Sequence, residues 1–421
     1  MNEPLVSSSP VQLVGYNVDT LYLNVRRRDS NGSLSRLGID DDVAMQLDDV
    51  QAMAKEQEHE VVTPWSFGGA PLMMQTHGAG RGQWRWLLTS PLLDLSISQG
   101  KLKGHILAQV RLSSRYLWSQ ETPGLAVCDI EEFLSSLFPY RLHLQVSEVH
   151  LCADIVGWDI GQANWQEGFV SRAVSTSARP DETDVEPGPQ VVRCRWKKLT
   201  TLEFGSHSSR LSCSIYNKSV EIQRSGKQWF EDIWKANGWD GEAPVWHVEF
   251  RFRREFLRVV GVEWAYDLMD MMKLLWDYAA GHATDGEDGL PDGWLRYVIP
   301  NPSDTTRSRW PVHPAWRVVQ RAFSDEAYSP VGSLVFKREK EVNVSKQVAA
   351  VAGYISSIAA QGGDLYPELN GDLDEVMTWM TQAVALDLHT KERVFLGVVR
   401  KKRPQFVRLP GKSLYKERKE A

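Results

Sequence analysis

The sequence predicts an α+β fold, with a mainly antiparallel sheet first and a mainly helical region after it. Strand-like segments occur in runs and do not alternate with helices, which argues against a parallel sheet of β-α-β units. Three segments between residues 149 and 253 alternate polar and apolar side chains with a period of two, the spacing of a β-strand. Beyond residue 262, apolar residues recur at helical spacing instead. The chain has 421 residues, enough for more than one domain.

The first half of the sheet region contains strands and two helices. Val43, Leu47 and Val50 recur at helical spacing and predict an acidic helix over 39–60. Asp129 is expected to cap a second, short helix. In chain order, the expected elements are a strand at 15–25, the helix at 39–60, strands at 83–88, 92–98 and 105–117, and the helix at 129–138.

We divide the chain into a disordered N-terminus, a sheet domain, a helical C-terminal domain and a basic tail. A segment rich in Pro, Ser, Asp and Glu interrupts the sheet domain and predicts a flexible loop. The boundaries are 1–10, 11–262 with the loop at 175–190, 263–399 and 400–421. Within the C-terminal domain, helices are expected at 264–279, within 294–323, at 337–360 and at 373–388.

Composition and charge exclude several classes of protein. The net charge of −6 argues against a protein that coats nucleic acid by bulk electrostatics. The four cysteines show no Cys-x-x-Cys spacing, so neither a disulfide framework nor a structural zinc knot is indicated. No apolar run approaches the roughly 20 residues that span a bilayer, and the start of the chain lacks the pattern of a signal peptide. We therefore expect a cytoplasmic protein without a membrane partner.

The three strands with period two, at 149–156, 211–218 and 246–253, carry most of the chemistry. Each has an apolar face and a face that collects polar side chains. If the strands are neighbours in one sheet, these polar side chains converge on a single surface, and the combination suits phosphodiester chemistry. The polar residues are His150, Cys152 and Asp154, then Ser212, Ser214, Tyr216 and Lys218, then His247, Glu249, Arg251 and Arg253.

Tyr216 and Lys218 form a candidate catalytic pair. A tyrosine is a poor nucleophile while it is protonated, and its ordinary pKa is about 10. An ammonium group two residues along the same strand face would favour the phenolate and balance the charge of an attacked phosphate. The alternative is a strand aromatic beside a solvated lysine, since tyrosine favours strands in general.

Asp154 and Glu249 are candidate ligands of a divalent metal ion. Carboxylates are depleted from strands and are rarely buried without a partner. Oxygen ligands suit Mg²⁺ or Mn²⁺, either of which would polarise a phosphodiester. The alternative is a structural ion pair with an arginine of the same face. Zinc on His150, Cys152 and Asp154 is disfavoured, because ligands at two-residue spacing splay apart on a flat strand and no fourth ligand is visible.

This region resembles the replication-initiation-factor family, which is typified by the initiators of staphylococcal rolling-circle plasmids and includes phage initiators and relaxases of integrative elements. The resemblance extends over about 11–260 and implies a nickase core related to the HUH type. It implies Tyr216 of the Tyr-Asn-Lys block as the nicking nucleophile, and Asp154 and Glu249 as metal ligands. The matching blocks are 150–159, 202–206, 214–219 and 245–251.

The chain departs from the family pattern in the first and last blocks. Members often carry Arg-x-Asp where this chain has Glu148 and His150, so either His150 replaces a carboxylate ligand or the metal has fewer protein ligands. His247 stands where an arginine is common. No His-hydrophobic-His dyad, the commonest metal motif of tyrosine-dependent nickases, occurs in the sequence.

The resemblance implies an origin-specific DNA nickase and strand transferase that initiates rolling-circle replication through a 5′-phosphotyrosyl intermediate. Its partners would be origin DNA, as a single strand or a hairpin, and a host helicase and polymerase; a homodimer stays open. The alternatives are a relaxase of a mobile element with the same chemistry, and a sequence-specific DNA-binding protein without catalysis. The basic residues that we assign to DNA contact are Lys197, Lys198, Arg251, Arg253 and Arg254.

Overall fold

The protein, described here as a computed structural model, divides into two compact units, Met1–Gly332 and Ser333–Ala421. The second unit contains helix α11 (Leu373–Thr390) and a parallel strand pair, β14 (Lys340–Glu341) with β15 (Phe406–Val407). No helix in the described part of the chain is long and apolar enough to cross a membrane. The structure describes residues 10–29, 32–35, 37–80, 82–99, 105–158, 160, 168–180, 199–206, 208–282, 292–324, 340–341, 373–390 and 406–407.

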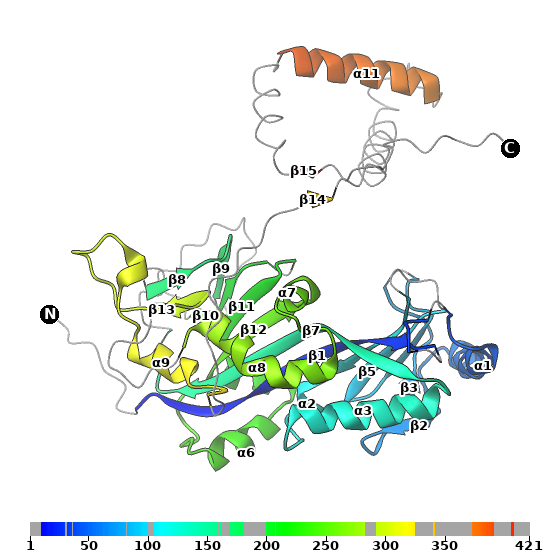
Figure 1. The fold of residues 1–421 in the computed structure, drawn as a ribbon, viewed down its shortest axis with the longest axis horizontal. Coiled ribbons are helices and arrows are strands. Elements are labelled where there is room, and N and C mark those ends of the chain that lie inside the picture. Colours follow the sequence, from blue (N-terminus) through cyan, green and yellow to red (C-terminus); the bar gives the residue numbers. More distant parts are fainter. Residues whose placement is uncertain are drawn as a thin grey trace. The chain divides into compact units, whose positions relative to one another are not determined.

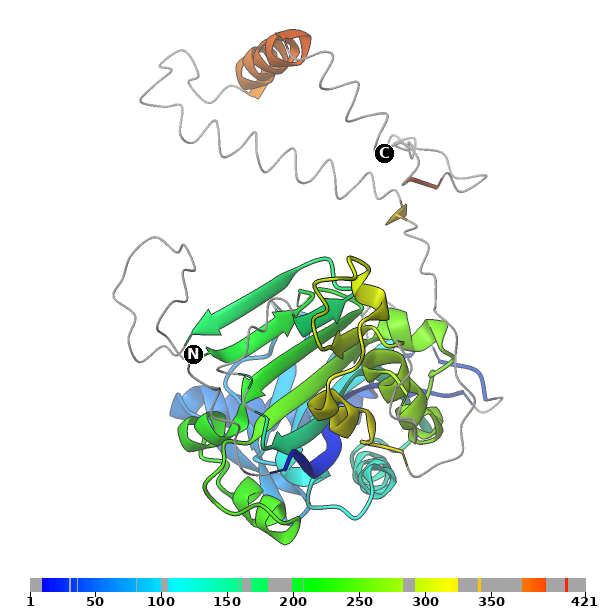
Figure 2. The same cartoon turned by 90° about the vertical axis from the view of Figure 1, so that its left-hand side faces the viewer.

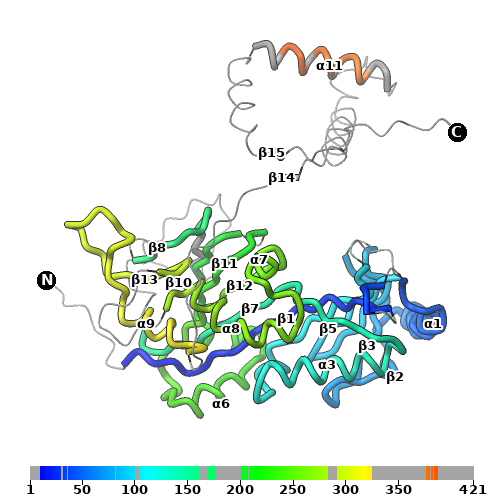
Figure 3. Tube along the Cα trace, viewed as in Figure 1, coloured from blue at the N-terminus to red at the C-terminus, as the bar shows by residue number. Residues whose placement is uncertain are grey.

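One antiparallel sheet of eleven strands organises the first unit (Figure 1). In chain order its strands are β1 (Gln12–Arg27), β2 (Val61–Phe67), β3 (Ala70–Met74), β4 (Trp86–Thr89), β5 (Leu93–Ile97), β6 (Ile106–Leu112), β7 (Leu142–Val156), β9 (Thr176–Pro180), β10 (Leu199–Phe204), β11 (Leu211–Asn217) and β12 (Trp246–Arg253). Across the sheet the order is β2-β3-β4-β5-β6-β1-β7-β12-β11-β10-β9. The two longest strands, β1 and β7, pair along their lengths at its centre (Figure 3).

Helices cover both faces of this sheet (Figure 2). Because the sheet is antiparallel and its strands come in runs, the unit is α+β, as predicted. On one face, Trp276 of α8 (Ala265–Ala280) contacts Phe250 of β12. On the other face, Trp234 of α6 (Trp229–Ala236) donates a hydrogen bond to Asp154 of β7. The remaining elements are α1 (Asp41–Gln57), α2 (Ser114–Leu117), α3 (Pro123–Leu137), α5 (Lys218–Ser225), α7 (Arg254–Val259), α9 (Pro314–Gln320), the 3-10 turn η2 (Arg307–Arg309) and a separate strand pair, β8 (Phe169–Ser171) with β13 (Leu295–Tyr297).

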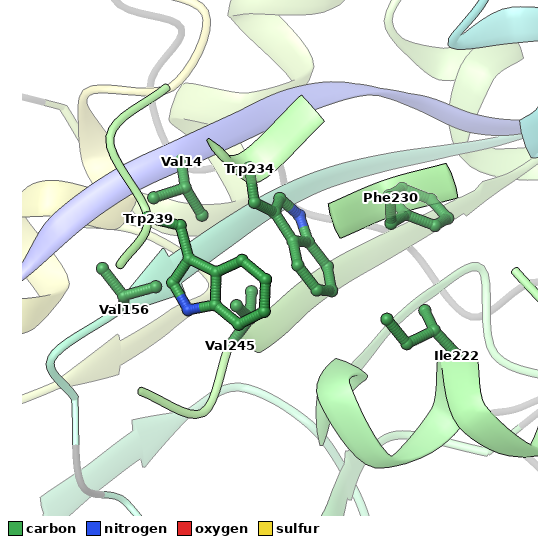
Figure 4. Packing of buried hydrophobic residues seen from close by; sticks show 7 residues of the cluster. All are labelled: Val14, Val156, Ile222, Phe230, Trp234, Trp239 and Val245. Atoms are coloured by element: carbon green, nitrogen blue, oxygen red, sulfur yellow. The ribbon is translucent and has the colours of Figure 1, made fainter. Parts of the chain in front are cut away.

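The polar face of β7 and β12 is buried. His247 and Asp154 are both fully inaccessible to solvent. Helices α5 and α6 place an apolar cluster over the end of this face (Figure 4). Charges taken out of water in this way need partners, which the site below supplies. The cluster consists of Val14, Val156, Ile222, Phe230, Trp234, Trp239 and Val245.

Three local predictions from the sequence need correction. The strand predicted at 105–117 ends at Leu112, and α2 follows it. The helix predicted from Asp129 begins at Pro123 instead, because the Thr122 side chain accepts a hydrogen bond from the backbone of the first turn and a proline is favourable there. The segment 175–190 is not a loop throughout, since β9 forms the edge of the sheet; residues 181–190 lie outside the described part.

The predicted domain boundary at 262 does not divide compact units. Helix α8 follows this boundary and belongs to the first unit, which extends to Gly332. The chain before α8 stays attached to the sheet, because the Val146 backbone NH donates to the Glu263 carbonyl. The segment 294–323 contains β13 and η2 besides its one described helix, α9. Three predicted segments lie outside the described residues for all or most of their length: the N-terminus at 1–10, the helix at 337–360 and the basic tail at 400–421.

Trp276 anchors α8 to the sheet. Its indole is fully buried with its ring centroid 5.2 Å from that of Phe250, and its Nε1 donates to the Val319 carbonyl at 2.9 Å. Trp276→Ala should therefore lower the free energy of unfolding by about 3–5 kcal/mol, through loss of buried area and creation of a cavity. Denaturant unfolding measures the effect, with Trp276→Phe as the milder control. A loss under about 1 kcal/mol, the size of an average substitution, would contradict this anchoring role.

Candidate active site

Three neighbouring strands bring the predicted polar residues together. In the register of the sheet, Tyr216 of β11 pairs with His247 of β12, which pairs with Asp154 of β7. In the adjacent row, Glu249 of β12 pairs with Cys152 of β7. The predicted convergence of these strands on one surface is therefore confirmed.

Lys218 reaches Tyr216 by a different route from the predicted one. The strand ends at Asn217, whose side chain accepts a hydrogen bond from the Val220 backbone and caps α5. Lys218 is thus the first residue of a helix and does not continue the strand face. Its Nζ nevertheless donates to the Tyr216 hydroxyl at 3.1 Å.

The Lys218 ammonium is buried and surrounded by anionic groups. It is 1% exposed, and its Nζ lies 3.3 Å from Glu221 Oε2 and 3.9 Å from Asp19 Oδ1. The Phe230 ring lies beneath it, with its centroid at 4.5 Å. Burial lowers the pKa of Lys218, but Tyr216, Asp19 and Glu221 hold this pKa well above its ordinary value. Lys218 is therefore a fixed positive charge beside the Tyr216 hydroxyl.

Tyr216 itself is protonated in the free protein. Burial raises the pKa of its phenol well above the ordinary value, and the opposing effect of Lys218 is smaller. The sequence predicts only the contribution of Lys218 and misses the burial. A nucleophilic Tyr216 thus needs additional positive charge close to its hydroxyl, and the adjacent cluster offers a place for it.

His247 is the centre of that cluster, and Asp154 fixes its orientation. The Nδ1 of His247 donates to Asp154 Oδ1 at 2.5 Å, while Asp154 Oδ2 accepts from Trp234 Nε1 at 2.8 Å. Burial and Lys218 lower the pKa of His247, but Asp154 outweighs them and raises it to about 9. A carboxylate behind a histidine in this way is typical of metal sites, because it orients the second ring nitrogen toward the ion.

The Nε2 of His247 points toward a group of metal-ligating atoms. Ligand atoms of Asp19, Cys152 and His247 lie within 4.8 Å of one another. Glu249 Oε2 lies 3.6 Å from His247 Nε2. Among the described residues, neither His247 Nε2 nor Asp19 Oδ1 has a hydrogen-bond partner. Buried polar atoms without partners are rare in proteins and are a feature of ion and water sites. Asp19 Oδ1 fits a divalent cation directly, and His247 Nε2 fits one once the ion has displaced the ring proton that its raised pKa implies.

The cysteine of this group is not suited to a hard cation. Burial raises the pKa of the Cys152 thiol well above its ordinary value, so it stays protonated. Its Sγ donates to the Asn17 carbonyl at 3.2 Å. Only the thiolate is an effective metal ligand. Of the group of three, Asp19 and His247 therefore remain as candidate ligands. Glu249 lies outside that group but approaches His247 Nε2 to 3.6 Å, and we add it as the third candidate.

This set differs from the predicted one of Asp154, Glu249 and His150 at two positions. Both carboxylate oxygens of Asp154 are occupied, so Asp154 supports the histidine and does not reach the cluster centre. His150 donates from Nε2 to Glu148 at 2.8 Å and from Nδ1 to Glu249 at 2.9 Å. Although burial lowers the pKa of His150, the two glutamates raise it above its ordinary value. His150 is thus a bridge between carboxylates, with no nitrogen left for a metal.

Asp19 is the site residue that the sequence analysis misses. It lies in β1, where the pairing with β7 shifts between Val18 and Thr20. The signal was available, because Asp19 is an acid near the middle of a strand, the same criterion that selected Asp154. What the sequence does not show is that β1 lies beside β7, so that its period-two face joins the same surface.

Most of the arginines predicted to bind DNA are engaged within the protein. Arg253 Nε lies 3.1 Å from Glu148 Oε2, and Arg251 Nε lies 3.6 Å from the other oxygen of the same carboxylate. Arg254 donates to the Val146 and Val262 carbonyls and pairs with Glu263. Their first role is to neutralise half-buried carboxylates and to tie α7 to the sheet. Lys197 and Lys198 lie outside the described residues.

Trp234 is predicted to stabilise the buried Asp154–His247 pair. Trp234→Phe keeps a ring in the apolar cluster but leaves Asp154 Oδ2 without its donor. We expect a loss of about 1–3 kcal/mol in the free energy of unfolding, the cost of a buried acceptor left unpaired. Denaturant unfolding measures this loss, and Trp229→Phe on the same helix is the matched control. Equal losses in the two variants would show that only ring packing matters.

No protein-family model matches the chain, and no curated protein matches it. Among solved structures, the chain is similar to the rolling circle replication initiator protein from Geobacillus stearothermophilus, with a TM-score of 0.38 and 13% sequence identity. The similarity covers 72% of this chain and 94% of that one. Because a similarity of this degree carries no argument about function, the proposal below rests on the residues of the site.

Proposed function

We propose that the protein cleaves and rejoins a DNA strand through Tyr216 and thereby initiates rolling-circle replication. One observation carries this proposal. The Tyr216 hydroxyl accepts a hydrogen bond from the buried Lys218 ammonium and lies in the sheet row beside His247, at the edge of a carboxylate-histidine cluster. A tyrosine nucleophile next to such a cluster suits transfer of a phosphoryl group.

The chemistry of the step balances without a further reactant. The Tyr216 oxygen forms a bond to the phosphorus of the strand, the bond from phosphorus to the 3′-oxygen breaks, and the phenolic proton is lost. The leaving 3′-oxygen takes up a proton and becomes a 3′-hydroxyl, the primer for synthesis. Lys218 supplies positive charge beside the attacking oxygen throughout. Since one phosphodiester replaces another, the same site can reverse the reaction and join strands.

Asp19, His247 and Glu249 would hold the divalent ion, with Asp154 behind the histidine. Mg²⁺ or Mn²⁺ fits the two carboxylates, and the imidazole donor favours Mn²⁺ of the two. When bound, such an ion polarises the phosphoryl oxygens and favours the phenolate of a neighbouring tyrosine. The residues of the chain orient the donors and keep the site shielded from water.

Two alternatives share parts of this site. A relaxase of a mobile element would use the same residues and chemistry, with a transfer site as its DNA. A DNA-binding protein without catalysis would not need this arrangement, because burying His247, Asp154 and Lys218 together costs stability that apolar residues would not. The catalytic interpretation accounts for that cost.

Covalent capture tests the proposal without knowledge of the origin sequence. The protein is incubated with Mn²⁺ and a pool of randomised single-stranded oligonucleotides, and complexes that survive SDS are isolated. Sequencing of the attached DNA should reveal a preferred cleavage sequence. After nuclease digestion and trypsin, mass spectrometry should find the nucleotide on the peptide 211–218, which contains Tyr216 as its one tyrosine. A nucleotide on any other peptide would refute the assignment.

A further inference from the structure

A second cleft, the cationic cleft, lies where α3 ends and β7 begins. Its volume is 660 Å³. It is formed by the last turn of α3, the turn that follows it, the start of β7 and the residue just after β1. The residues that matter for its chemistry are Arg28, Glu131, Tyr140, Arg141 and His143.

The cleft presents positive charge that the described residues do not neutralise. Arg28 Nη2 lies 2.5 Å from His143 Nε2, and burial together with the Arg28 charge lowers the pKa of His143. His143 is therefore a neutral acceptor and leaves the Arg28 charge intact. The Nε of Arg28 is buried without a hydrogen-bond partner among the described residues. Arg141 is exposed and forms no ion pair within the described part of the chain.

The carboxylates around the cleft are held in place by other groups, and no described one pairs with Arg28. Glu131 accepts a hydrogen bond from the Tyr266 hydroxyl at 2.6 Å. Asp40 is paired at 2.6 Å with Arg27, whose guanidinium lies over the Tyr140 ring. Asp267 accepts from two backbone NH groups at the start of α8. No described carboxylate thus lies within salt-bridge distance of Arg28, and a ligand with its own negative charge would complete the site.

One further arginine lies beside the cleft. Arg26 faces His143 in the register of β1 and β7, and its charge contributes to lowering the pKa of His143, after burial and Arg28.

Along β1, the cleft is separated from the row of Tyr216 by about one repeat of duplex DNA. Gly15 pairs with Asp154 in that row, and Arg26 pairs with His143 at the cleft. The eleven steps from Gly15 to Arg26 rise about 36 Å at roughly 3.3 Å per residue. One turn of B-form DNA measures about 34–36 Å. Tyr216 itself lies three strands to the side, on β11, so a duplex that runs along β1 would bring phosphates one turn apart to the cleft and to the near end of that row.

We propose that the cationic cleft binds phosphates of a DNA duplex about one helical turn from the strand held at Tyr216, with Arg28 and Arg141 as the contact residues. The position of the DNA rests on the proposed function, whereas the anion-binding character of the cleft rests on the charges described above. Such a contact positions the DNA and carries no sequence information.

The test is the salt dependence of binding to a fluorescein-labelled 30-base-pair duplex of arbitrary sequence, followed by anisotropy. The variant Arg28→Gln/Arg141→Gln should bind about tenfold more weakly at moderate salt, and its log–log slope should fall by about 1.8, or about 0.9 for each phosphate that is no longer neutralised. The matched control is Lys55→Gln/Arg321→Gln, which removes two exposed positive charges elsewhere and should change the affinity less than twofold. Arg141→Gln alone, at an exposed position, should give about half of the slope change even if the double variant folds poorly.

Two outcomes would overturn the proposal. One is an unchanged slope in both cleft variants, or an equal change in the control. The other concerns pyrophosphate. If pyrophosphate raises the melting temperature of the unmodified protein but not of the cleft variants, and the variants still bind duplex DNA normally, then the cleft binds a free phosphate compound and not DNA. Because the assay measures binding alone, it can be repeated with Tyr216→Phe. If the cleft variants change the slope but the unmodified protein never forms a covalent DNA adduct, the proposal for the cleft stands and the proposed nicking activity is refuted.

Discussion

Tyr216→Phe is expected to abolish covalent DNA attachment and strand cleavage, with a fall in rate of about four to six orders of magnitude. Removal of a nucleophile costs this much in enzymes in which one side chain forms the covalent bond. The substitution deletes one oxygen and keeps the ring, so the half-buried side chain still packs against His247. DNA binding should remain close to that of the unmodified protein.

The change should cost little stability, which makes the result interpretable. Tyr216→Phe removes one hydrogen bond from Lys218, while Glu221 and Asp19 remain beside the ammonium. A loss of about 0.5–1.5 kcal/mol is the expected size for one hydrogen bond. Circular dichroism and thermal unfolding check that the variant is folded.

Tyr266→Phe is the matched control for this experiment. Its hydroxyl also makes a side-chain hydrogen bond, to Glu131, but it is exposed and lies on α8, outside the catalytic rows. It should cleave DNA at the unmodified rate. Persistent cleavage by Tyr216→Phe with an adduct on another tyrosine would move the nucleophile elsewhere in the chain.

Much of the strand chemistry could be predicted because it depends on local alternation. A period of two assigns each residue of β7, β11 and β12 to a face without knowledge of its neighbours. That is sufficient to place Tyr216 and Glu249 on one surface once the strands pair. It is also sufficient for an α+β class, since runs of strands and later helices are visible in the sequence.

The ligand set could not be predicted because it depends on register and on a helix distant in sequence. Asp154 can bind an ion only if one of its carboxylate oxygens is free of other hydrogen bonds. Trp234 of α6 and His247 itself occupy both of them. In the same way, Glu148 and Glu249 take up both ring nitrogens of His150. A strand pattern places a side chain on a face but does not give its partners on that face.

The buried charges illustrate the same limit. A polar strand face is typical of contact with solvent. Here α5 and α6 pack over that face, and their apolar residues shield Lys218 and His247 from water. Burial then reverses the simplest expectation for Tyr216, because it raises the pKa more than Lys218 lowers it.

Asp19→Asn is expected to weaken Mn²⁺ binding by roughly 100-fold and to reduce cleavage correspondingly. The substitution removes a negative charge from a hard-cation site while preserving the shape of the side chain. Calorimetry or the paramagnetic resonance of Mn²⁺ gives a measure of binding that does not depend on activity. Full cleavage in EDTA would refute a metal role altogether.

His150→Gln decides between the ligand set of the structure and the set of the sequence. In the structure, His150 only bridges Glu148 and Glu249, so its loss should weaken Mn²⁺ binding by less than about tenfold, as expected for an outer residue that orients a ligand. Asp154→Asn should fall between the two, at about 10–100-fold, because it acts through His247. A stronger effect of His150→Gln than of Asp19→Asn would place the ion on the other side of Glu249. His150 would then be a ligand, Asp19 would serve only as a counter-ion of Lys218, and the 3.6 Å approach of His247 to Glu249 would be a structural ion pair.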